Sequence, residues 1–91
     1  MLNNEIGKSA PAAVEEAELM RQLALNLRWL RGIYDLPQRA LAEYLHVDRS
    51  TYCYYETGTS HPPVITLKKI ANYYRLGMDD LVNEELRILS F

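Results

Sequence analysis

The stretch from Arg49 to Tyr55 combines side chains that suit nucleic-acid contacts with side chains that suit a protein core. Tyr52 and Tyr55 lie three residues apart and can pack together on one face of a helix. The outward positions are then Arg49, Ser50, Thr51 and Tyr54. The planar guanidinium of Arg49 matches the O6 and N7 atoms of guanine, a contact that discriminates by about 1–3 kcal/mol. The neighbouring hydroxyl and methyl groups suit base edges, thymine methyls and phosphates.

No residue pattern of an enzyme accompanies this stretch. The sequence has no glycine-rich phosphate loop, no HExxH or CxxC spacing and no evident pairing of a nucleophile with a base. His46, His61 and the single cysteine, Cys53, have no companion ligands for a metal ion. We therefore expect no catalysis, no cofactor and no metal site.

The elements that must position these side chains are predicted to be helices. Asp35 is placed to cap a helix in which Gln38 reaches back, and Asp48 is placed to cap the next one. Gly58 is suited to end that helix, and the two prolines that follow favour an extended segment. The expected helices cover residues 11 to 32 or 33, 38–45, 49–57, 66–75 and 77–86. No strand alternation is present, so the predicted class is all-α with five helices.

One face of each longer helix is apolar and is expected to form the core. The inward residues are predicted to be Leu19, Leu23, Leu27 and Leu30, then Ala40, Leu41, Tyr44 and Leu45, and finally Leu67, Ile70, Ala71 and Tyr74. Apolar residues make up 48% of the chain, which is enough for a modest packed core.

Charge is distributed unevenly along the chain. The net charge is −2, but eight of the twelve acidic residues lie before residue 20 or after residue 78. Residues 20–78 carry eight basic and four acidic side chains, a balance of +4. A locally basic surface for phosphate groups is therefore expected on an acidic chain.

Two short helices joined by a three-residue turn are typical of a helix-turn-helix. The spacing is kept by Leu27, Arg28, Arg31, Leu36, Gln38, Leu41, Ala42, Leu45, Val47, Arg49, Ser50, Thr51, Glu56, Gly58, Pro62, Thr66, Leu67, Ile70, Ala71, Asp79, Asp80 and Leu81. On these residues, the range from about 23 to 82 resembles the phage repressor and Cro type of domain, which is lambda repressor-like and of the XRE family. The resemblance implies a compact five-helix fold whose third helix lies in a DNA major groove. It also implies a transcriptional regulator, in the first place a repressor, that binds double-stranded operator DNA as a homodimer.

The resemblance further implies roles for single residues. The expected DNA contacts are Gln38, Arg39, Arg49, Ser50, Thr51, Tyr54, Thr59 and Ser60. Gln38 is expected against the phosphate backbone, and the loop after the third helix is expected to offer hydroxyl and backbone donors. Arg31 and Glu56 are expected to form a partly buried ion pair that ties the first helix to the third. His46 stands where the family often has a turn glycine, so it is expected at positive φ.

The domain organisation follows from these assignments. Residues 1–18 are expected to be a flexible lead with an N-terminal extension of the first helix, residues 19–83 the helix-turn-helix domain, and residues 84–91 an apolar tail. The sequence shows neither a signal peptide nor an apolar run of membrane-spanning length, so we expect a cytoplasmic protein without a membrane segment.

A second function remains open from the sequence. The same fold could serve as a protein-interaction module or an antitoxin-like protein that binds a protein partner. The acidic ends, the lysine-poor loop and the apolar tail residues Leu86, Ile88, Leu89 and Phe91 favour that alternative. The tail and the extension from Ala12 to Leu19 are both candidate dimer interfaces, and both could instead pack against the chain's own core.

Overall fold

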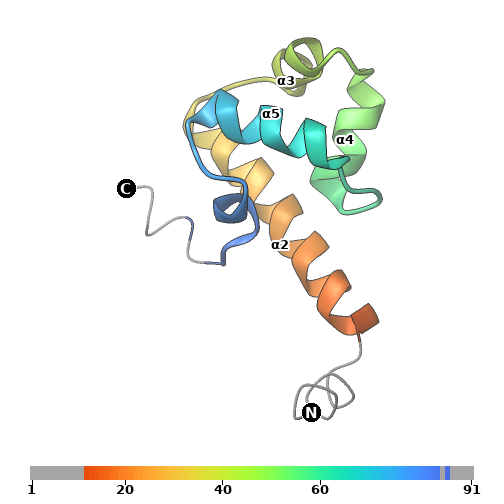
Figure 1. The fold of residues 1–91 in the computed structure, drawn as a ribbon. Helices are drawn as coiled ribbons and strands as arrows, with labels where there is room; N and C mark the ends of the chain where they lie inside the picture. The colour runs from red at the N-terminus through yellow and green to blue at the C-terminus, as the bar shows by residue number, and fades with distance from the viewer. Residues whose placement is uncertain (1–11, 85, 87–91) are drawn as a thin grey trace.

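The computed structural model describes residues 12–84 and residue 86, and every regular element in that range is helical (Figure 1). The elements are α2 (Ala12–Ile33), α3 (Gln38–Leu45), α4 (Arg49–Thr57), α5 (Val64–Tyr74) and the 3-10 helix η1 (Asp79–Val82). The all-α class is therefore confirmed. No helix within the described range has both the length and the apolar content that crossing a membrane requires.

The predicted fifth α-helix is wrong in type and extent. Where one continuous α-helix was expected over residues 77–86, the described residues form the four-residue 3-10 helix η1, then leave helical geometry at Asn83 and return to it at Leu86. The buried side chain of Asn26, on α2, donates from Nδ2 to the carbonyl oxygens of Leu81 (2.8 Å) and Asn83 (3.0 Å). Asn83 itself has extended backbone angles. These two hydrogen bonds from α2 coincide with the end of η1. Sequence periodicity contains no information about contacts between such distant residues.

The predicted caps are only partly right. Asp35 does not cap α3, because it lies in the turn before that helix with φ 54°, and the N-cap residue is Pro37. Asp48 does occupy the N-cap of α4, but its side chain makes no capping hydrogen bond. At the other end of α3, His46 has φ 61°, so its predicted left-handed conformation is confirmed. Helix α5 begins at Val64, two residues earlier than expected.

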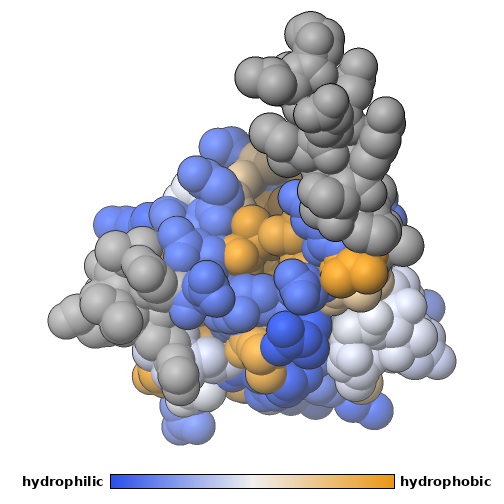
Figure 2. Space-filling view, turned by 90° about the horizontal axis from the view of Figure 1, so that it is seen from below, coloured by the Kyte–Doolittle hydropathy of each residue, from blue (hydrophilic) through white to orange (hydrophobic). Residues whose placement is uncertain are grey.

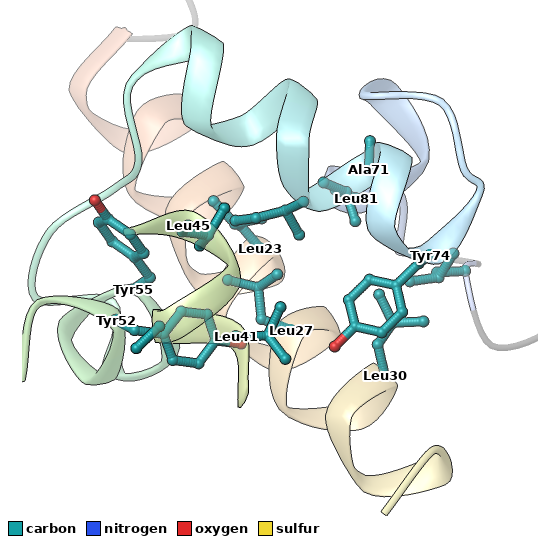
Figure 3. Close-up of a cluster of buried hydrophobic side chains, with 13 residues drawn as sticks. Leu23, Leu27, Leu30, Leu41, Leu45, Tyr52, Tyr55, Ala71, Tyr74 and Leu81 are labelled. Carbon is teal, nitrogen blue, oxygen red and sulfur yellow. The ribbon is translucent and has the colours of Figure 1, made fainter. Parts of the chain in front are cut away.

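The core lies where α2 meets the other elements (Figure 3). Each of the five elements contributes at least one side chain with no exposed surface, and the largest from each are Leu27, Leu41, Tyr52, Ile70 and Leu81. Full burial of a leucine or isoleucine side chain contributes about 1.5–3 kcal/mol relative to exposure. The inward packing of Tyr52 and Tyr55 is confirmed, so one face of α4 is committed to the core.

Two residues predicted to point inward are exposed instead. Tyr44 is 42% exposed and packs its ring against Tyr73 of α5, with the ring centroids 4.7 Å apart. Leu19 is also exposed, because the first half of α2 extends beyond the body formed by the other helices (Figure 1). Figure 2 shows the face at this end of the molecule, where apolar side chains gather among hydrophilic ones.

The start of the expected apolar tail belongs to the core. Leu86 is buried and packs with the residues of the central cluster. Leu86 is therefore removed from any dimer interface built from the tail. The other tail residues of the prediction, Ile88, Leu89 and Phe91, lie outside the described residues, as do residues 1–11 of the expected lead.

Candidate nucleic-acid interface

The end of α4 is fixed to α2 by an ion pair. The Glu56 side chain is only 1% exposed, and Arg31 donates to it from Nε to Oε2 (2.6 Å) and from Nη2 to Oε1 (3.0 Å). Arg31 also donates from Nη1 to the Leu36 carbonyl (2.8 Å) in the chain between α2 and α3. Paired bonds of this kind fix orientation as well as distance. A single guanidinium thus holds three segments of the fold together.

The electrostatics of the pair keep both groups charged. Burial by itself would raise the pKa of Glu56, but hydrogen bonds from Arg31 and Gln38 outweigh it and hold that pKa below its usual value. The same hydrogen bond raises the pKa of Arg31. Nearby, burial raises the pKa values of the Tyr52 and Tyr74 hydroxyls, so both tyrosines remain neutral. The ion pair therefore sits in a region where an unpaired charge would be costly.

Gln38 connects this buried pair to the surface. Its Nε2 donates to Glu56 Oε1 (3.1 Å), and its Oε1 accepts a hydrogen bond from Arg49 Nη1 (3.1 Å). A carboxylate only accepts hydrogen bonds, so the amide nitrogen of Gln38 must face Glu56 and its oxygen must face outward. The result is a continuous chain of hydrogen bonds from α2 to the exposed start of α4.

The outer face of α4 has the exposure that direct contacts with a ligand require. Arg49, Ser50 and Tyr54 are exposed, and Thr51 is half-buried. Arg39, at the start of α3, is also exposed and lies 3.8 Å from Glu43 as a surface ion pair. The polar face predicted from the sequence is thus present, and the guanidinium of Arg49 on this face is already hydrogen-bonded to Gln38.

The loop after α4 uses more of its polar groups in hydrogen bonds within the chain than expected. The backbone N–H groups of Thr59 and Ser60 both donate to the Tyr54 carbonyl (3.1 and 3.3 Å), which closes the end of α4. Gly58 makes this turn possible with φ 78°. The Thr59 hydroxyl lies 2.8 Å from that of Thr57. The backbone donors predicted at Thr59 and Ser60 are therefore already used, so of the predicted contacts the Ser60 hydroxyl and the Thr59 hydroxyl, which is shared with Thr57, remain for a ligand.

Two positioning residues were missed by the sequence analysis. Arg28 Nη1 donates to the Glu56 carbonyl and so anchors the last turn of α4 from α2. Asn26 holds η1, as described above, and accepts a hydrogen bond from Gln22 (3.0 Å). The available signal for Asn26 was a polar residue that interrupts the apolar face formed by Leu23, Leu27 and Leu30.

Comparisons with known proteins agree with this geometry. A family model described as helix-turn-helix matches residues 27–81, which include all of α3, α4 and α5. The chain is 36% identical over 59 residues to the cryptic phage CTXphi transcriptional repressor RstR of Vibrio cholerae, covering 65% of this chain and 53% of the relative. It is 35% identical over 66 residues to the HTH-type transcriptional activator BcrR of Enterococcus faecalis, covering 71% of this chain and 32% of that protein.

The matches cover only part of each relative. The chain spans about half the length of the repressor and about a third of the length of the activator. No solved structure matches the chain at a significant level. The family model, however, covers more than half of the chain and contains both ends of the Arg31–Glu56 pair. The chain therefore belongs to the helix-turn-helix family, and its resemblance to the phage repressor type of domain is confirmed.

Proposed function

We propose that this chain is a sequence-specific DNA-binding regulator of transcription, in the first place a repressor, that inserts α4 into the major groove of operator DNA. The observation that carries the proposal is the contrast between the buried end and the exposed start of α4. Its far end is fixed by Glu56 in the core, and its first turn presents Arg49 and Ser50 to solvent. A helix held at one end and polar at the other is what a major-groove contact requires.

Arg49 is the residue proposed to contact base edges directly. Its guanidinium is already oriented by Gln38, so less side-chain freedom is lost when it pairs with guanine. Ser50 and Thr51 are proposed to contact neighbouring base edges, and Tyr54 a phosphate or sugar. These contacts supply the sequence dependence of binding.

The start of α3 is proposed to hold the phosphate backbone. Pro37 is its N-cap residue and provides no side-chain capping bond. The Ala40 N–H donates to the Pro37 carbonyl (3.0 Å), so the N–H groups of Gln38 and Arg39 are the ones proposed to meet an anion. The backbone N–H of Gln38 and the guanidinium of Arg39 lie at the same end. The hydroxyls of Thr59 and Ser60 are proposed as further backbone contacts. Such contacts fix the position of α4 on the duplex.

We further propose that the chain acts as a homodimer on a two-fold symmetric operator. Helix-turn-helix dimers bind half-sites about one helical turn, or roughly 34 Å, apart. The two relatives are named as a repressor and an activator, and repression is proposed first because the repressor is matched over a larger share of its length. A reporter gene placed behind the selected operator would show the direction of regulation.

Selection of bound fragments from a pool of random DNA tests this function. We expect a consensus with two-fold symmetry and saturable binding that weakens steeply as salt is added, since bound phosphates release counterions. Salt-sensitive binding with no enriched sequence would contradict sequence-specific recognition. Capture of a protein partner together with no salt-sensitive DNA binding would instead favour the protein-interaction alternative.

A further inference from the structure

A groove runs along the first half of α2, where this helix extends beyond the rest of the fold (Figure 1). Two neighbouring hollows form it, and both are lined by Leu19 and Val82. The more apolar hollow, of about 340 Å³, is also lined by Met20, Leu23 and Leu67. Leu19 is 45% exposed, and Met20, Leu67 and Val82 are half-buried. The floor of this α2 groove is therefore apolar and open to solvent.

The sides of the α2 groove are acidic. Four exposed glutamates line the two hollows, namely Glu15, Glu16, Glu18 and Glu84. None of the four forms an ion pair within the described part of the chain. The basic groups in the lining are the guanidinium of Arg21 and the imidazole of His61. Carboxylates thus outnumber guanidinium groups by four to one beside the apolar floor.

The length and position of the groove suit a short helix as its occupant. Leu19 and Met20 lie one turn before the buried Leu23, and they continue the inner face of α2 beyond the part that other elements cover. From Glu15 to Leu23, α2 rises about 12 Å, or a little over two turns. A helix laid along this length can insert apolar side chains at positions i, i+3, i+4 and i+7.

The charge of the groove selects the chemistry of that helix. Basic side chains flanking its apolar face would lie beside the four glutamates, where opposite charges attract. Such complementarity favours the matching partner and speeds its association. An acidic helix with the same apolar residues would be repelled. A second copy of this chain fits less well, because it would bring the same glutamates together.

We propose that the α2 groove binds an amphipathic helix of another protein that carries lysine or arginine beside its apolar face. This inference goes beyond the proposed regulator of transcription and does not depend on it. The groove shares no residue with the contacts proposed for DNA. Substitutions in the groove should therefore leave operator affinity unchanged.

Selection from a displayed library of helical peptides tests the proposal. The library fixes leucine at positions i, i+3, i+4 and i+7 and randomises the positions between them. The wild-type chain and the Leu19→Gln variant serve as bait in parallel. We expect lysine and arginine to be enriched over aspartate and glutamate among peptides that only the wild type retains. No such peptide, or an enrichment of acidic residues, would overturn the proposal.

Fluorescence anisotropy with one retained peptide locates the site. Leu19→Gln should weaken binding about tenfold or more, because it places an amide in the apolar floor. Ile33→Gln is the matched control, since Ile33 is 42% exposed at the other end of α2. Joint replacement by Glu16→Gln and Glu18→Gln should weaken binding and reduce its dependence on salt, whereas Glu43→Gln on α3 should do neither. Circular dichroism checks that each variant remains helical.

Other occupants of the groove would give different results. Peptide binding that appears only after residues 87–91 are removed would assign the groove to the chain's own tail. Self-association that Leu19→Gln abolishes would assign it to a second copy. Either result, or equal peptide affinity of the wild type and Leu19→Gln, would overturn the proposal. Failure of DNA selection with normal peptide binding would overturn only the DNA-binding function.

Discussion

The two ends of α4 differ more than their separation of seven residues suggests. At the end of the helix, Glu56 is buried and held by Arg31, Gln38 and the fold around them. At the start, Arg49 is exposed and its side chain donates a hydrogen bond to Gln38. Both ends carry charge. Burial decides whether that charge contributes to the stability of the fold or to contacts with another molecule.

The comparison separates two properties that one helix must provide. A helix that contacts DNA, as proposed for α4, must be rigid relative to the rest of the domain, and the buried end of α4 supplies that rigidity. It must also present polar groups that the fold does not need for its stability, and the exposed first turn of α4 does this. We therefore expect substitutions at the two ends to change different measurements, and the following predictions test that separation.

Glu56→Ala should give the largest effect and should act on stability. It leaves the guanidinium of Arg31 without its carboxylate, and breaking a buried pair in this way typically costs about 3–5 kcal/mol. Urea unfolding followed by circular dichroism measures the free energy of unfolding. Glu43→Ala is the control, because Glu43 pairs with Arg39 on the surface, where such pairs contribute less than about 0.5 kcal/mol. Equal losses for both variants would contradict the prediction.

Acid should weaken the buried end of α4 by protonating Glu56. The pKa of this group is lowered in the folded chain, so its contribution is fully present above the ordinary value of 4.5 and is lost as the pH falls through the folded-state pKa. The effect should be smaller than that of Glu56→Ala, because the side chain remains in place. The free energy of unfolding, measured from pH 7 down to pH 3, should fall more steeply in the wild type than in Glu56→Gln. Parallel curves would argue against a linked group at this position.

Arg49→Ala should act on binding and leave stability almost unchanged. Loss of a bidentate contact to guanine is expected to weaken binding to the selected operator by about 1–3 kcal/mol, roughly five- to 150-fold. The free energy of unfolding should change by less than about 0.5 kcal/mol, because the residue is exposed. Fluorescence anisotropy with labelled operator measures the first quantity. Arg75→Asn removes the same charge at the end of α5, where φ is 60° and asparagine is tolerated, and should cost much less affinity.

Gln38→Ala should affect both measurements, with a smaller stability loss than Glu56→Ala and a smaller affinity loss than Arg49→Ala. It removes a hydrogen bond to Glu56, with an expected loss of about 1 kcal/mol of stability, and it releases the side chain of Arg49. We expect operator affinity to fall by a few-fold. A variant that loses affinity at unchanged stability would show that Gln38 acts on DNA alone and does not couple the two ends.

The sequence predicted this helix-turn-helix well because its signals are local. Helices α3 and α4 begin and end where the spacing indicated, and the left-handed residues His46 and Gly58 mark their ends. The inward pair Tyr52 and Tyr55 followed from helical periodicity alone. In these segments, the residues that determine the structure are close neighbours in the chain.

The errors have the opposite cause. Asn26 donates to carbonyl oxygens that lie 55 and 57 residues further along the sequence. The residues near position 80 therefore did not indicate where η1 would end. The exposure of Tyr44 depends on how much of α3 is covered by α5, which the pattern within α3 does not contain. Likewise, each hydrogen bond of Gln38 joins separate elements. The polar face of α4 was predictable from the sequence, whereas the way it is held required the tertiary structure.

The burial of Leu86 has a practical consequence for shortening this chain. A deletion made after Asn83 would take a core side chain away together with the tail, and the shortened protein would then unfold more readily whatever the tail does. A cut made after Leu86 keeps every core side chain of the described residues. The boundary of a minimal stable fragment therefore lies at least three residues after Asn83, the residue that caps η1.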